Sequence, residues 1–243
     1  MKDILIDRHT TQEEADNIVF SKRGEYKFIQ LLHSDVVLDI PEYVNCKNLN
    51  IMGCPNITEL PMCNFQRLRV SNLKGTNGIK KLPDWINCEI VHISGMDEMP
   101  KTLNAEQFTV EESKMRTFNV KGRFDQLSLQ HCPNLKSIGS NPATNSLSVM
   151  WCPKLTDISL NTEVSNIYFV EVGIYDLNFL NPRGKYGYVV LSDCSNITEI
   201  PEWLNCYQLE VKNCPNIETI PDSVIKRCKK VKFIVDDEPV FIK

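Results

Sequence analysis

The sequence predicts an α/β-type solenoid, in which short parallel strands stack side by side and irregular or 3₁₀ segments return the chain. A pattern, L-x-V-x-x-C-x-x-I-x-x-I-P, recurs about every 20 residues. Within each repeat apolar and polar residues alternate, as in Leu209 and Val211 against Glu210 and Lys212, which is typical of a strand with one buried face. Five of the repeats carry a cysteine at the same position. A motif that recurs along one chain indicates a repeating structural element rather than a single active site.

Eleven candidate repeats fill residues 28–235, between two caps. In residues 1–27, the stretch TTQEEADNIVF has a Thr N-cap and acids in its first turn, which predicts a short helix over the first repeat. The first apolar positions of the repeats are Ile29, Leu49, Leu68, Val91, Phe108, Leu127, Leu147, Ile167, Val189, Leu209 and Val231. Residues 236–243 form the C-terminal cap, where VKFIVDDEPVFIK predicts a last strand, an acidic turn and a short apolar strand.

A turn and a return segment close each repeat. Pro215 favours a turn after one strand, and Ile217 and Ile220 follow it as apolar positions of the return. A closing proline recurs at residues 41, 61, 83, 100, 201 and 221. Returns of this length leave room for extended or 3₁₀ segments and hardly for a helix.

On these residues the chain resembles the leucine-rich-repeat family, from about residue 28 to 235. The short period and the Ile/Leu-Pro ending resemble the bacterial subtype found in effector proteins. The Cys-x-x-Ile elements, Cys54-Ile57 and Cys214-Ile217, instead resemble the cysteine-containing subtype, whose repeats are longer. The chain departs from the commoner Asn-x-Leu form. The resemblance implies a horseshoe with a parallel β-sheet on a concave binding face and mostly irregular or 3₁₀ convex segments.

The ten cysteines fall into two rows. One row follows the strands, where the side chain turns inward: Cys54, Cys132, Cys152, Cys194 and Cys214. The other precedes them: Cys46, Cys63, Cys88, Cys206 and Cys228. No close Cys/His pair of zinc-binding spacing occurs, so we expect no metal and no cofactor. Stacked cysteines are near enough for disulfides, but equivalent side chains point the same way and a reducing compartment keeps them as thiols.

Composition and charge narrow the class of protein. The net charge is −4 and the isoelectric point about 5.7, so no overall positive field attracts nucleic acid or anionic lipid. No apolar run has the roughly 20 residues of a membrane span, and the first residues do not resemble a secretion signal. We expect a cytoplasmic protein, of a bacterium or of a host cell if the chain is an effector.

Catalysis is not indicated by the sequence. The common nucleophile, metalloprotease and phosphate-loop motifs do not occur, and the chain has four histidines. His131 and Cys132 are neighbours, but adjacent strand residues face opposite ways or leave the strand together. We therefore expect a protein that is not an enzyme.

Strand residues that alternate with the core predict a binding surface in the middle repeats. Trp151, Met150, Tyr168 and Val170 form an apolar cluster there, with His131 on the preceding strand. The acids that ring it are Glu111, Glu112, Glu171 and Asp193. Aromatic anchors in a polar rim favour a protein partner with an apolar knob flanked by Lys or Arg. Two alternatives stay open: Trp151 folds back over its neighbours, or a register slip of one exchanges core and surface.

The function that follows is a non-enzymatic protein–protein interaction module that binds on its concave face. It would act as a scaffold, or as a bacterial or phage effector or inhibitor. The alternative is a nucleic-acid-associated protein that uses the basic run Lys226–Lys232. The simpler interpretation of this run is a solvated cap on the last repeat. The residues leave open the partner and the oligomeric state.

Overall fold

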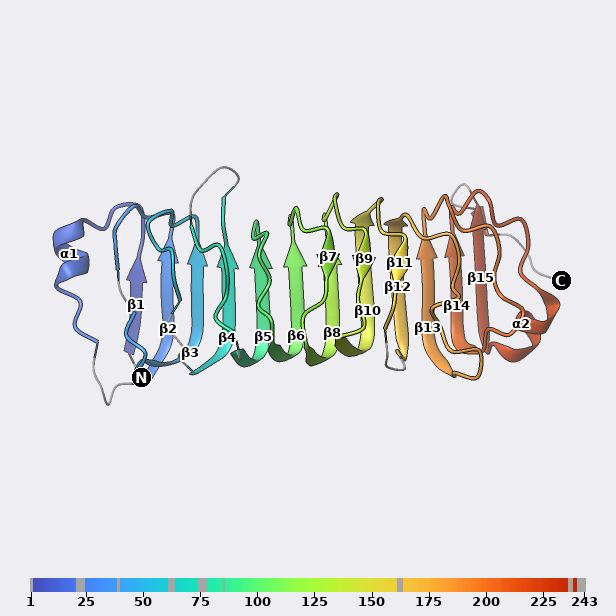
Figure 1. Cartoon of the computed structure of the whole chain (residues 1–243), viewed down its shortest axis with the longest axis horizontal. Coiled ribbons are helices and arrows are strands. Elements are labelled where there is room, and N and C mark those ends of the chain that lie inside the picture. The colour runs from blue at the N-terminus through green and yellow to red at the C-terminus, as the bar shows by residue number, and fades with distance from the viewer. Residues whose placement is uncertain are drawn as a thin grey trace. The chain divides into compact units, whose positions relative to one another are not determined.

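The chain folds as a parallel-strand β-solenoid with short helices near its ends (Figure 1). The computed structural model describes residues 2–20, 25–38, 40–60, 64–73, 78–84, 86–160, 164–235 and 238–239. The chain divides into two units. The first is Met1–Lys114 with Val120–Arg123, and the second is Met115–Asn119 with Phe124–Lys243.

In the first unit the strands β1 to β6 pair in chain order, and every pair is parallel. They are β1 (Lys2–Ile6), β2 (Glu25–Leu32), β3 (Asn45–Met52), β4 (Asn64–Ser71), β5 (Ile86–Ser94) and β6 (Leu103–Glu111). The predicted first apolar positions lie in one register and are buried: Ile29, Leu49, Leu68, Val91 and Phe108. The repeat frame is therefore confirmed for these five repeats.

The N-terminal region holds both the predicted helix and a strand that was not predicted. Helix α1 (Gln12–Asp16) begins after Thr11, whose hydroxyl accepts from the Glu14 N–H while the Glu14 carboxylate accepts from the Thr11 N–H. Gln12 exchanges hydrogen bonds of 2.9 and 3.0 Å with the backbone of Val37, which holds the helix against the first return segment. Strand β1 lies inside residues 1–27, which were predicted as a cap, and it pairs with β2. Its sequence lacks the cysteine and proline that mark the other repeats.

In the second unit the sheet order is β8-β10-β12-β13-β14-β15-β16. The bounds are β8 (Gly122–Gln130, residues 124–130 in this unit), β10 (Pro142–Cys152), β12 (Asn166–Val172), β13 (Tyr186–Ser192), β14 (Cys206–Lys212), β15 (Lys230–Val235) and β16 (Glu238–Pro239). The first apolar positions are again in register: Leu147, Ile167, Val189, Leu209 and Val231. Strand β16 turns back antiparallel, as the predicted acidic turn requires, and the rest of the predicted last strand lies outside the described residues.

The return segments of the second unit, predicted as extended or 3₁₀ segments, pair with each other. Short parallel strands form a three-stranded sheet: β7 (Thr117–Phe118), β9 (Ser137–Ile138) and β11 (Asp157–Ile158). Stacking brings each return within reach of the next, so the Gly139 N–H donates to Phe118 O (2.9 Å) and the Ser159 N–H to Ile138 O (2.8 Å). The extended part of the prediction is confirmed, and none of the described returns contains a 3₁₀ segment.

One return is helical, although the sequence suggested hardly any room for a helix. Helix α2 (Asp222–Arg227) follows Pro221, and its last turn carries Lys226 and Arg227, which complement the negative C-terminal end of a helix. In the described ranges no helix is long and apolar enough to cross a membrane.

The two predicted rows of cysteines face the core. Nine cysteines are described, all of them buried free thiols, while Cys63 lies outside the described residues. In the row after the strands each thiol donates to the carbonyl two residues earlier, as Cys152 Sγ does to Met150 O (3.3 Å). In the other row Cys206 Sγ lies 3.3 Å from Cys228 Sγ. Burial raises the pKa of the Cys88 thiol to about 12, which fits a role in packing.

Candidate functional site

The outward face of the second unit is the side of its strands opposite the core. The strand register places two rows of residues across it, Ser148–Tyr168–Val190 and Met150–Val170–Ser192. Val149, between Ser148 and Met150, is fully buried, whereas its two neighbours are half-buried. Met150, Tyr168 and Val170 therefore lie on the outward face, in the register from which the binding surface was predicted.

In each of these coils, the residue after the last outward-facing strand residue has a left-handed backbone. Its φ lies between 50° and 55° at His131, Trp151, Glu171, Asp193 and Asn213, and we call these five residues the rim row. The N–H of a rim residue donates to the carbonyl that ends the next strand, as His131 N does to Met150 O (3.0 Å). This turn interrupts the alternation, so Met150 and Trp151 both avoid the core in succession. The predicted site residues of the rim row thus lie at the C-terminal edge of the outward face and not on its pleat.

Trp151 and His131 form a stacked pair on the rim row. Their ring centroids are 4.3 Å apart and the ring planes are 6° from parallel. Trp151 keeps 37% of its surface exposed, so the indole is supported on one face and open to solvent. Bulky residues are rare at positive φ, where a side chain crowds the following carbonyl. Trp151 lies outside the core, where Cys152 turns inward, and its indole packs over the neighbouring His131, as the alternative that Trp151 folds back over its neighbours expects.

Tyr168 continues the apolar surface from Trp151 toward the N-terminal ends of the strands. It lies beside Val190, while Met150 and Val170 fill the row between Tyr168 and the rim. Burial raises the pKa of the Tyr168 hydroxyl, and the neighbouring Tyr188 adds to that rise. The phenol is therefore neutral at physiological pH, as an apolar anchor should be.

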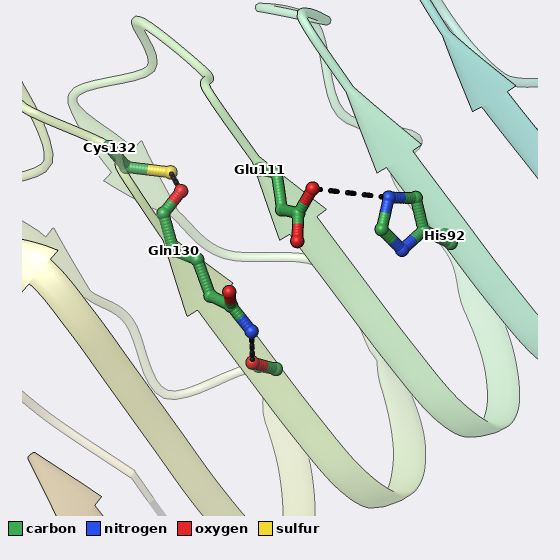
Figure 2. A network of polar contacts seen from close by, with 5 residues as sticks. His92, Glu111, Gln130 and Cys132 are labelled. Atoms are coloured by element: carbon green, nitrogen blue, oxygen red, sulfur yellow. Dashed lines mark hydrogen bonds and ion pairs between the residues drawn. The ribbon is translucent and has the colours of Figure 1, made fainter. Parts of the chain in front are cut away.

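The four predicted acids divide between the two units. Glu171 and Asp193 are exposed members of the rim row, so they lie at the same edge as Trp151. Glu111 and Glu112 belong to the first unit. Glu111 Oε2 lies 3.3 Å from His92 Nε2, as Figure 2 shows. Glu112 is exposed at positive φ (54°), at the position in the first unit that corresponds to the rim row.

His92 is held in its neutral form in the first unit. Burial lowers the pKa of its imidazole and the nearby Arg69 acts in the same direction, while Glu111 opposes them. The side chain is 24% exposed and lies on the outward row Gln30–Asn50–Arg69–His92–Thr109. That row is polar. The contact with Glu111 becomes an ion pair only when acid protonates the imidazole.

The sequence reasoning missed a second aromatic group on the second unit. Tyr188 and Tyr207 are 41% and 43% exposed, and their rings meet edge to face with centroids 6.2 Å apart. Lys229 Nζ and Lys230 Nζ lie 5.4 and 5.8 Å from the Tyr207 ring centroid. Both tyrosines precede the first apolar position of their repeats, outside the positions that were read as surface. The aromatic residues in KYGYVV and NCYQL were the available signal.

The arrangement offers an exposed surface for contact with another molecule. Around His131 the polar contacts are structural: Gln130 Nε2 donates to Ser128 Oγ (2.8 Å), and Cys132 Sγ donates to Gln130 O (3.2 Å; Figure 2). No cluster of three or more potential metal ligands occurs among the described residues. What the outward face offers is flat apolar surface with charges at its edges.

Comparisons with known proteins give one distant likeness. Two curated matches, both described as disease resistance protein RRS1 of Arabidopsis thaliana, are 25% identical to the chain over 157 residues. The matched part is 62% of this chain and spans 11% of the length of those proteins. No protein-family model matches the chain, and no solved structure is significantly similar. Together with the parallel-strand solenoid, the likeness fits a repeat protein of the protein-interaction type.

Proposed function

We propose that the chain is a non-enzymatic module that binds a partner protein on the outward face of its second unit. The stacked Trp151–His131 pair is the observation that carries this proposal. A solvated tryptophan held at positive φ costs conformational energy without filling the core, and tryptophan is prominent among residues that dominate binding energy. Met150, Tyr168 and Val170 extend the anchor into a continuous apolar surface.

The charge around this anchor defines the partner. Glu171 and Asp193 lie on the same rim row as Trp151, and neither makes an ion pair within the described residues. A complementary partner presents an apolar knob flanked by Lys or Arg. Binding would mask a partner surface or recruit it, as an effector, inhibitor or scaffold does. A cytoplasmic setting belongs to the same proposal, because the nine described cysteines are free thiols.

An affinity capture from cell lysate, read by mass spectrometry, tests the proposal. The wild type is compared with the Trp151→Glu, Tyr168→Glu double variant, after circular dichroism shows that both are folded. Tyr175→Glu is the matched control, because Tyr175 is 60% exposed and lies outside the strands. We expect a protein that the wild type and the control retain and the double variant loses. Retention by the double variant would place binding elsewhere on the chain.

The basic run Lys226–Lys232 also bears on the alternative of nucleic-acid binding. Lys232 Nζ is 3.1 Å from Glu210 Oε2, and Lys226 and Arg227 complement the end of α2, so part of the charge is used within the chain. Lys229 and Lys230 remain beside Tyr207. Affinity for single-stranded RNA that falls steeply between low and moderate salt would favour this alternative. An apolar protein interface would change little.

A further inference from the structure

The aromatic residues of the second unit form a diagonal across its outward face. We define the aromatic stripe as Trp151, Tyr168, Tyr188 and Tyr207, one from each of β10, β12, β13 and β14. Tyr168 pairs with Val190, so Tyr188 lies two residues nearer the N-terminal end of its strand. Tyr188 pairs with Gln208, so Tyr207 lies one residue nearer still. Each later aromatic residue is thus displaced in the same direction.

The stripe is long. It crosses three strand spacings, about 14 Å, and descends by about six residues, or about 20 Å, so its ends are about 25 Å apart. Met150, Val170 and Val190 widen the apolar surface toward its Trp151 end, and polar residues flank this surface, with Ser148 and Asn166 on one side and Ser192 and Lys212 on the other. A surface about 25 Å long matches an extended segment of about seven or eight residues. A rounded knob would cover only part of it.

The two ends of the stripe carry opposite charges. At the Trp151 end, Glu171 and Asp193 are exposed on the rim row. At the Tyr207 end, Lys229 and Lys230 hold their ammonium groups over the ring. Beside the stripe, on β14 and β15, Glu210 and Lys232 form an ion pair of 3.1 Å, so these two charges offset each other. This polarity also disfavours nucleic acid, because phosphates along the stripe would meet the carboxylates at one end.

We infer that the stripe binds an extended segment of the partner with a basic residue at one end, apolar residues in the middle and an acidic residue at the other. The basic residue lies on the open face of Trp151 beside the Glu171 carboxylate, with Asp193 next along the rim row, and the acidic residue contacts Lys229 and Lys230. This inference rests on the proposed function, since it names the occupant of the same face. It adds a second anchor, Tyr207 with its two lysines, and fixes the direction in which the segment lies.

A displayed library of random dodecamer peptides, selected on the full chain, tests the inference even while the partner is unidentified. Five proteins are compared: wild type, the Trp151→Glu/Tyr168→Glu variant, Lys229→Glu/Lys230→Glu, Glu171→Lys/Asp193→Lys, and Lys226→Glu/Arg227→Glu. The last is the control, because it makes the same charge change as the Lys229/Lys230 variant but on α2. Circular dichroism establishes that each is folded. We expect wild type and control to enrich peptides with Lys or Arg and Asp or Glu separated by about six to eight residues, the length of the stripe. Each reversal at an end should select the opposite charge at that end alone.

Synthetic copies of an enriched peptide then give the magnitude by fluorescence anisotropy. Reversal at either end should weaken the wild-type peptide at least about tenfold, and the α2 control should leave it unchanged. Enrichment that depends on Trp151 and Tyr168 but shows no charge polarity would overturn this inference and leave the proposed function standing. Loss of any dependence on Trp151 and Tyr168 would overturn both. Single-stranded RNA that competes with the peptide and requires Tyr207 would replace the peptide as occupant.

Discussion

At the scale of single residues, the recurring left-handed turn has a conformational cost wherever a residue other than glycine adopts it. Seven described non-glycine residues have positive φ, and Gly53 and Gly95 occupy the same position without strain. A side chain there crowds the neighbouring carbonyl by about 1–2 kcal/mol. At Trp151 the proposed binding role gives a reason to keep a strained residue. At Glu112 no described contact offsets this conformational cost.

Glu112→Gly should therefore stabilise the chain. We expect the free energy of unfolding to rise by about 1 kcal/mol, because glycine adopts φ of 54° freely. The control is Glu106→Gly, a change of the same chemistry at an exposed, extended position of β6, which should lower stability by about 0.5–1 kcal/mol. Urea unfolding followed by circular dichroism measures both. A loss of stability in the Glu112 variant would show that its carboxylate makes a contact worth more than the strain.

His92 should make stability depend on pH. Its pKa in the folded chain lies below the ordinary value of 6.5 because burial disfavours the imidazolium. The unfolded chain then binds the proton more readily, so stability is complete above about pH 6.5 and falls as pH drops from there toward the lowered folded pKa. His92→Gln should flatten this part of the curve. Unfolding midpoints in urea at pH 7.5, 6.5 and 5.5 test it, and parallel curves for variant and wild type would contradict it.

At the scale of elements, the structure is a stack of coils that approach closely on the return side. Gly173 follows β12, and a Cβ built on it would lie 2.2 Å from the carbonyl oxygen of Pro153 on the preceding coil. Its own carbonyl accepts from Asn196 Nδ2 (3.1 Å) on the next coil. The absence of a side chain at this position therefore sets how closely three consecutive coils can stack.

Gly173→Ala should separate those coils and lower the free energy of unfolding by about 2 kcal/mol, the usual range for overpacking. Gly187→Ala is the control, because its added methyl would crowd a side-chain amide, that of Asn166, and would meet backbone, at Ser165 O, only at an ordinary contact distance of 3.6 Å. We expect the control to lose less than about 1 kcal/mol. Thermal and urea unfolding give both values. Equal losses in the two variants would mean that the backbone contact at Gly173 relaxes without cost.

The elements also show how much of the fold could be predicted from the sequence. The apolar register from Ile29 to Val231 was predictable, since burying one strand face leaves a pattern of period two that recurs with each coil. Strand β1 was not, because an end repeat lacks the cysteine and proline of its neighbours. The left-handed turn was hidden as well. Seven of the nine described residues that adopt it are His, Trp, Glu, Asp or Asn and only two are Gly, and the hydrogen bond that fixes it joins two coils and leaves no local signature.

At the scale of the whole molecule, the two units are built from the same kind of coil but expose different outward surfaces. The outward rows of the first unit are polar, with Asn50, Arg69 and His92 in one of them. The second unit carries the aromatic stripe. The cluster of Met150, Tyr168 and Val170 could be read from alternation alone. Tyr188 and Tyr207 could not, because they join the surface through the diagonal offset between strands, which only the three-dimensional register reveals.

The central claim is that this outward face is where a partner protein binds. Hydroxyl-radical footprinting of the captured complex, read residue by residue by mass spectrometry, tests it most directly, since Met, Trp and Tyr react fastest. We predict that Trp151, Met150 and Tyr168 are oxidised in the free chain and protected in the complex. Tyr43 and Tyr175, 46% and 60% exposed and outside the strands, should react equally in both. Protection of Tyr43 or Tyr175 with Trp151 still fully reactive would contradict the claim.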